Sequence, residues 1–462
     1  MYRESIVLGV APTKRGILSM EEASRQKDRF MKVVREAMPD LVQIVDLDDI
    51  CENGILYTMD DVPAAIEKFH TARVDALFIP FCDFGEEQCA AAIAAAFKVP
   101  VLVWGARDEV PNVDGARGRD TQCGMFAATK VLRRCGVKYS YIINCETESA
   151  TFRTGLDRFL RVAAILKSVR SLRIAVVGQR PGPFMSVMTN EGNLLTRFGI
   201  QTIPVSASSV AQRATEMIAK GDSEFEEYYQ DLKSRMDCST MPEEGVRTAA
   251  ALKISLQRFI TENNCSAAAV ECWSAFRALV GIPPCLALGE LSDLGLPASC
   301  ETDLNGAVTM AILRACALYE QAVFLADLTI RNPENDNSEL LWHCGPFPYS
   351  LKSESCPARL VEARERFELR QGHLTLARFD DIDGEYTLFA GEGGTTTGPE
   401  TTGTYVYLEV DDWKRWEEKL MFGPYIHHIG CVYGSHLPVL REVARYLDIT
   451  FDDASVQGIH SL

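Results

Sequence analysis

The sequence lacks the features that mark several large classes of proteins. No run approaches the roughly 20 apolar residues that a membrane-spanning helix requires, and none of the 15 cysteines forms a Cys-x-x-Cys pair. No apolar stretch of signal-peptide length follows a basic segment near Met1. We therefore expect no membrane association, no zinc knuckle and a cytoplasmic protein with reduced, mostly buried thiols.

Positive charge is scarce as well, with 47 Lys and Arg against 64 Asp and Glu and a net charge of −17. This balance argues against nucleic acid or an anionic membrane surface as a partner. An anionic substrate would need arginine or lysine placed locally around it. The glycines of residues 178–183 lack the Gly-x-Gly-x-x-Gly spacing, so no nucleotide cofactor is implied.

The chain has 462 residues, of which 47% are hydrophobic and 24% charged, and this composition is typical of a folded protein with two or three domains. Short apolar runs at 6–10, 74–80 and 100–104 alternate with helical patterns, and the same rhythm restarts at 172–178. This alternation predicts an α/β fold with two doubly wound, Rossmann-like parallel-sheet domains.

After Arg331 the pattern changes to alternating strands separated by Gly- and Asp-rich turns, as at 373–378, 386–390 and 403–410. Such a pattern is typical of a β-barrel or sandwich. We therefore predict three domains: an N-terminal α/β domain at 1–168, a second α/β domain at 169–340, and a β-rich C-terminal domain at 341–462.

Two acidic residues follow short apolar runs in the second predicted domain. Glu301 ends a strand-like segment, Thr302 or Asp303 can cap the helix that follows, and Asp327 lies 26 residues after Glu301. This spacing suits a strand–helix–strand unit with parallel strands, which would bring both carboxylates to one sheet edge. There they could hold a divalent cation and move a proton, although capping or solvated carboxylates would show the same spacing.

Three segments stand out: Cys300-Glu-Thr-Asp303 before a helix, Phe324-Leu-Ala-Asp327 after it, and the pair His427-His428. Together they resemble the L-fucose isomerase and L-arabinose isomerase superfamily. The resemblance implies a metal-dependent aldose–ketose isomerase that acts on an open-chain monosaccharide through an enediolate. It also implies Mn²⁺ or another divalent cation, and a homo-oligomer, trimer or hexamer.

The resemblance assigns roles to residues of this chain. Glu301 and Asp327 match the acids that bind metal and flank C1 and C2 of the sugar, and His428 matches a metal ligand. His343 matches a further metal-side histidine of the arabinose isomerases, which fucose isomerases do without. His427 is then expected to bind substrate or to orient its neighbour.

Weaker candidates for substrate contacts are Gln122 and Arg180, which lie in predicted loops, and Trp273, which follows a predicted strand. In this superfamily a neighbouring subunit helps to close the active site. Ordinary surface loops and a buried aromatic residue are the alternative explanations.

The substrate stays open between neutral sugars and a sulfonated hexose such as sulfoquinovose, for which Arg180 is the cation that the sequence suggests. A second class of function is a non-catalytic sugar-binding protein, since two successive α/β lobes also describe such proteins. The expected absence of a signal peptide and the third, β-rich domain argue against it.

Overall fold

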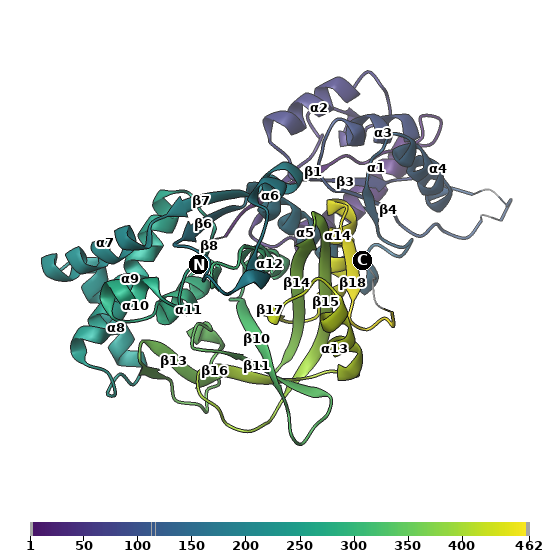
Figure 1. The fold of residues 1–462 in the computed structure, drawn as a ribbon. Coiled ribbons are helices and arrows are strands. Elements are labelled where there is room, and N and C mark those ends of the chain that lie inside the picture. Colours follow the sequence, from purple (N-terminus) through teal and green to yellow (C-terminus); the bar gives the residue numbers. More distant parts are fainter. Residues whose placement is uncertain (1–2, 112, 116, 459–462) are drawn as a thin grey trace. The chain divides into compact units, whose positions relative to one another are not determined.

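The computed structural model describes residues 3–111, 113–115 and 117–458. It divides the chain into two compact units, Arg3–Lys167 and a second that begins at Ser168 (Figure 1). The residues that the sequence predicts as metal ligands all belong to the second unit.

The first unit is built on a five-stranded sheet in the order β2-β1-β3-β4-β5, with every pairing parallel. All six residues of β3 are buried, as expected for a strand covered on both faces. The strands are β1 Ile6–Val10, β2 Val42–Val45, β3 Ala76–Phe81, β4 Val101–Gly105 and β5 Tyr139–Tyr141. The helices are α1 Met20–Ala37, η1 Glu52–Gly54, α2 Val62–Thr71, α3 Glu87–Ala95, α4 Thr121–Arg134 and α5 Ala150–Ser171.

The second unit begins with another parallel sheet, which has four strands in the order β7-β6-β8-β9. These strands are β6 Arg173–Val177, β7 Gln201–Val205, β8 Ala267–Val270 and β9 Ala298–Cys300. The accompanying helices are η2 Met185–Val187, α6 Glu191–Phe198, α7 Ala207–Lys220, α8 Ser223–Arg235, α9 Glu243–Glu262, α10 Ala275–Val280, α11 Cys285–Asp293 and α12 Leu304–Cys316. The two sheets confirm the predicted pair of parallel-sheet folds.

A closed six-stranded antiparallel barrel follows. Its strands run β16-β11-β10-β17-β14-β15, and the pairing of β15 with β16 closes the ring. They are β10 Phe324–Arg331, β11 Ser338–His343, β14 His373–Ile382, β15 Glu385–Thr396, β16 Thr404–Glu409 and β17 His428–Tyr433. Outside the ring lie η3 Tyr349–Leu351, β12 Arg359–Val361, β13 Arg364–Glu368, α13 Trp413–Phe422, α14 Leu437–Leu447 and β18 Thr450–Asp453. The predicted barrel is confirmed.

The predicted parallel strand–helix–strand unit around Glu301 and Asp327 is wrong. β9 belongs to the parallel sheet, whereas β10 pairs antiparallel with β11 and β17 in the barrel. The helix between them, α12, packs against β8 and β9 and also against β14 and β17, and all 13 of its residues are buried. It therefore lies between sheet and barrel and brings the two acids together from different sheets.

One continuous hydrophobic core joins the parallel sheet to the barrel within the second unit. It includes Val270 of the sheet, Phe324 and Leu376 of the barrel and Trp416 of α13. Such a core holds the edges of both sheets rigidly around the space between them. The predicted division into 1–168, 169–340 and 341–462 stays a prediction.

Within the described ranges no helix is long and apolar enough to cross a membrane. None of the fifteen cysteines, all of which lie in the described ranges, forms a disulfide, and ten of them are buried.

Candidate active site

Glu301 enters the site from a strained turn at the end of β9. Its backbone has φ +61° and that of Thr302 has φ +57°, both in the left-handed region, where each non-glycine residue costs about 1 kcal/mol or more. Trp273 Nε1 donates a hydrogen bond of 2.8 Å to Glu301 Oε1. Backbone strain at a buried acid is typical of functional sites. The hydrogen bond from Trp273 occupies Oε1, so that Oε2 of Glu301 faces the barrel.

Asp303 caps α12 and orients His428. The amide of Gly306 donates to Asp303 Oδ1 at 2.8 Å, and Arg378 donates to both carboxylate oxygens at 2.5 and 3.1 Å. His428 Nδ1 lies 2.8 Å from Asp303 Oδ2 and donates its proton there. Burial would raise the pKa of Asp303, but Arg378 and His428 hold that pKa well below its usual range. In the neutral ring the lone pair of His428 is therefore on Nε2.

The barrel register places Asp327 beside His428. Asp327 on β10 is the cross-strand partner of His428 on β17. His428 Nε2 lies 3.0 Å from Glu301 Oε2 and 3.5 Å from Asp327 Oδ1. Burial would lower the pKa of His428, but Asp303 and Glu301 raise it to about 9. That raised pKa reflects a strongly negative potential, which also attracts a cation.

Two further imidazoles face Asp327. His343 Nε2, at the end of β11, lies 3.9 Å from Asp327 Oδ1, and His427 Nε2 lies 4.0 Å from the same oxygen. The amide of Cys344 donates a 2.9 Å hydrogen bond to His343 Nδ1. In a neutral ring this bond leaves the proton of His343 on Nε2. Burial and the neighbouring His428 lower the pKa of His427, whose side chain is 44% exposed.

Four buried polar atoms around this point make no hydrogen bond within the described part of the chain. They are Glu301 Oε2, Asp327 Oδ1, His343 Nε2 and His428 Nε2. Asp327, His427 and His428 can also each offer one ligand atom within 4.8 Å of the others. Adjacent ligands of an octahedral cation bound at about 2.1 Å lie about 3 Å apart. Carboxylate and imidazole donors at such spacing fit a divalent cation such as Mn²⁺.

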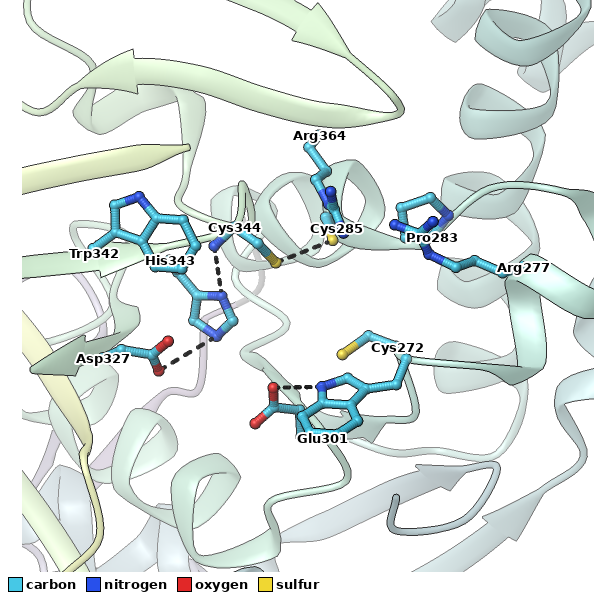
Figure 2. Close-up of a pocket in the computed structure, with 11 residues that line it drawn as sticks. Cys272, Arg277, Pro283, Cys285, Glu301, Asp327, Trp342, His343, Cys344 and Arg364 are labelled. Atoms are coloured by element: carbon cyan, nitrogen blue, oxygen red, sulfur yellow. Dashed lines mark hydrogen bonds and ion pairs between the residues drawn. The ribbon is translucent and has the colours of Figure 1, made fainter. Parts of the chain in front are cut away.

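A pocket of about 480 Å³ opens beside these atoms (Figure 2). Its volume falls in the range of small-molecule sites. Acids and an imidazole lie on some of its sides, and guanidinium groups and thiols lie on others. The lining residues are Cys272, Trp273, Arg277, Pro283, Cys285, Glu301, Asp327, Trp342, His343, Cys344 and Arg364.

Of the weaker candidates, Trp273 lines the pocket and bonds to Glu301. Arg180 instead stabilises its own loop, because its Nη1 donates to the carbonyls of Pro181, Gly182 and Phe184 at 3.0 to 3.1 Å. The Phe184 ring lies 5.6 Å from the ring of Trp273 and from each ring of the His427-His428 pair. Arg180 thus shapes the loop that covers the histidines.

Gln122 lies at the start of α4 in the first unit, and its side chain is exposed. Its predicted substrate contact stays a prediction.

Sequence reasoning missed three arginines of the second unit. Arg378 is buried against Asp303, and Arg277 and Arg364 line the pocket. From the sequence Asp303 is only a candidate helix cap, although its place two residues after Glu301 points to the same site. Nothing local marks the arginines, because each comes from a segment distant in sequence from the acids.

Comparisons with known proteins find similarity to sugar isomerases. Residues 9–170 match the family model described as the N-terminal domain of fucose/sulfoquinovose isomerase. A sulfoquinovose isomerase of Priestia megaterium is 25% identical over 87% of this chain and 90% of its own length. One from Alkalicoccus urumqiensis is 26% identical over 86% of this chain and 89% of its own length.

These matches give the class of the protein: it is an enzyme, a sugar isomerase. The chain is similar to proteins of the fucose/sulfoquinovose isomerase family. Among solved structures, an ABC transporter solute binding protein from Bacillus halodurans aligns with 68% of this chain and 90% of its own, at 14% identity. Its TM-score of 0.17 carries no argument for the sugar-binding alternative.

Proposed function

We propose that this enzyme is a metal-dependent aldose–ketose isomerase and that a sulfonated hexose, sulfoquinovose, is its substrate. The observation that supports the metal is that His428 Nε2 lies 3.0 Å from Glu301 Oε2 and 3.5 Å from Asp327 Oδ1. These three buried atoms make no hydrogen bond within the described residues. The sulfonated substrate rests on the printed names of the relatives. The neutral monosaccharides of the wider superfamily are the second candidate class.

In this proposal Glu301, Asp327 and His428 hold the cation. His343 is the predicted fourth ligand, although the Cys344 amide favours a proton on the nitrogen that would bind. When bound, a divalent cation stabilises negative charge that develops on O1 and O2 of the open-chain sugar. The Asp303 carboxylate keeps the proton of His428 on Nδ1 and so keeps Nε2 available.

The chain's own acids perform the proton transfer. One carboxylate, Glu301 or Asp327, removes the proton from C2 of the aldose, and a proton returns to C1 of the enediolate. The hydroxyl proton of O2 moves to O1, which gives the ketose. Trp273 fixes the Glu301 carboxylate by its hydrogen bond, and Phe184 covers the histidine pair. His427, which is partly exposed, is placed to contact a sugar hydroxyl.

The test is isomerisation of sulfoquinovose and neutral aldoses, measured as ketose formation after EDTA treatment and after addition of Mn²⁺. Activity should disappear with EDTA and return with Mn²⁺. The Glu301→Gln variant should fold as the parent does and convert no sugar. Undiminished turnover in either case would refute the proposal.

Assembly into a trimer or hexamer and a cytoplasmic location rest on the resemblance and the composition alone, and both stay proposals. Size-exclusion chromatography with light scattering tests the first of these.

A further inference from the structure

The charged groups that line the pocket are separated by sign. Its carboxylates, Glu301 and Asp327, lie at the candidate metal site. In Figure 2 Arg277 enters from the side opposite Asp327, and Arg364 enters from the side opposite Glu301. A sugar whose C1 and C2 lie against the acids would therefore extend its far end toward two guanidinium groups.

These two arginines lack the carboxylate partners that other arginines of the chain have. Arg258 and Arg378, for comparison, each bind acidic side chains through at least two hydrogen bonds. Within the described residues Arg277 makes no ion pair to an acid. Arg364 has only Glu362 at 3.4 Å, whose side chain is 71% exposed. A surface pair of this kind contributes little, and the guanidinium otherwise lies beside the thiols of Cys285 and Cys344 rather than a second acid.

Arg364 is also held in place by close packing, and its Nε–H donor makes no hydrogen bond within the described residues. This Nε is buried, and an unsatisfied buried donor costs about 1–3 kcal/mol. Gly345, with φ +139°, lies so close that an added Cβ would be 2.9 Å from Arg364 Cβ and 2.7 Å from the Glu365 amide nitrogen. This close packing fixes the start of β13 against the pocket.

We propose that Arg277 and Arg364 form the subsite for the anionic group at the C6 end of the substrate, and that this group is a sulfonate. This inference rests on the proposed isomerase function, which places C1 and C2 at the acids. A sulfonate has three acceptor oxygens, and two guanidinium groups can donate to them with charge-assisted hydrogen bonds. In a chain of net charge −17, a local cationic site also offsets the long-range repulsion of an anionic sugar.

The test compares sulfoquinovose with 6-deoxyglucose, which lacks only the sulfonate, in the Mn²⁺-loaded full-length protein. The variants are Arg277→Gln, Arg364→Gln and the conservative Arg364→Lys. Arg366→Gln, an exposed arginine two residues further along β13, is the matched control. Each steady-state measurement reports kcat and KM separately for both sugars.

In each glutamine variant the ratio of kcat/KM for sulfoquinovose to kcat/KM for 6-deoxyglucose should fall roughly 10- to 100-fold. The fall should come from a higher KM for sulfoquinovose. Arg364→Lys should restore part of that ratio, and Arg366→Gln should leave it unchanged. If Arg364→Gln does not fold, Arg277→Gln still tests the proposal. Binding of sulfoquinovose to Glu301→Gln, with and without Arg277→Gln, tests it without turnover.

The failures are distinguishable. If the parent enzyme converts no sugar with Mn²⁺, the proposed function fails and this inference fails with it. If it converts sugars but the arginine variants leave the ratio unchanged, only the arginine subsite is overturned. If glucose 6-phosphate is converted better than sulfoquinovose in an arginine-dependent way, the subsite binds phosphate and the sulfonate assignment is overturned.

Discussion

His428 and His343 approach the same oxygen of Asp327, yet their rings are committed to different hydrogen bonds. His428 donates from Nδ1 to Asp303, which in the neutral ring leaves a lone pair on Nε2. His343 accepts at Nδ1 from the Cys344 amide, which leaves a proton on Nε2. At the residue scale, the hydrogen-bond partner of Nδ1 therefore decides whether Nε2 of each histidine can bind a cation.

This difference predicts unequal effects of two matched substitutions. His428→Gln should lower Mn²⁺ affinity by more than the roughly 10- to 100-fold lost when a residue that only orients a ligand is removed. His343→Gln, which keeps a side-chain N–H donor, should change the affinity less than about tenfold. Titration with Mn²⁺ followed by the EPR signal of the free ion measures both. Equal losses would make His343 a full ligand.

Substitutions at Asp303 and Asp380 distinguish the orientation of His428 from the stability of the fold. Asp303→Asn removes one acid from buried Arg378, and breaking such a pair costs about 3–5 kcal/mol. It also weakens the contact to His428 and should lower Mn²⁺ affinity roughly 10- to 100-fold. Asp380 accepts a 2.7 Å hydrogen bond from Arg378 without a hydrogen bond to His428, so Asp380→Asn should lower stability alone. Urea unfolding and Mn²⁺ titration of both variants check this, and equal loss of metal affinity would contradict it.

At the scale of elements, α12 is the part that joins the two halves of the site. Asp303 caps it, Glu301 precedes it, and its body packs on barrel strands β14 and β17. Gly430 on β17 allows this contact, because an added Cβ would lie 2.7 Å from Thr309 Cγ2 and 2.9 Å from Leu313 Cδ1. The distance between helix and barrel thus sets the distance between Glu301 and His428.

Gly430→Ala should consequently push α12 away from the barrel. Overpacking of this kind costs about 1–3 kcal/mol, and Thr309, being β-branched, cannot rotate freely to relieve it. Both the free energy of unfolding and Mn²⁺ affinity should fall. Gly394→Ala on β15 is the control, because its Cβ would have no atom within 4 Å. A Gly430→Ala protein that unfolds and binds Mn²⁺ as the parent does would contradict this account.

The sequence predicted these elements well and their pairing less well. Hydrophobic periodicity located strands β1, β3, β4, β6, β14, β15 and β16 and the helix α12, with Asp303 as one of two candidate caps, but it did not locate α7, α11, α13 or β17. The partner of β10 could not be read in this way, because a short apolar run fits a parallel or an antiparallel neighbour equally. The acids were found through a resemblance of local motifs. Arg277 and Arg364 were not, because their shared pocket arises only from tertiary packing.

At the scale of the whole molecule, most of the acids that give the net charge of −17 can remain solvated or paired, but Glu365 cannot. It is fully buried on β13, and neither of its carboxylate oxygens makes a hydrogen bond within the described ranges. Burial raises the pKa of Glu365 well above its usual range, and the nearby acids Glu290 and Asp293 raise it further. Arg235 donates to Glu290 at 2.8 Å and offsets only part of this charge.

Stability should therefore fall as pH rises, and Glu365 should account for a measurable part of the fall. The folded state keeps the Glu365 proton above about pH 4.3, where the unfolded chain has lost it, so the folded state binds more protons. Each unit by which the pKa is raised corresponds to about 1.4 kcal/mol of stability lost over that interval. Glu365→Gln cannot ionise, so its free energy of unfolding should exceed that of the parent increasingly between about pH 4.5 and about pH 8. Urea unfolding across this range measures the difference, with exposed Glu385→Gln as the control. Parallel curves for the parent and Glu365→Gln would show that Glu365 is already ionised in the folded protein.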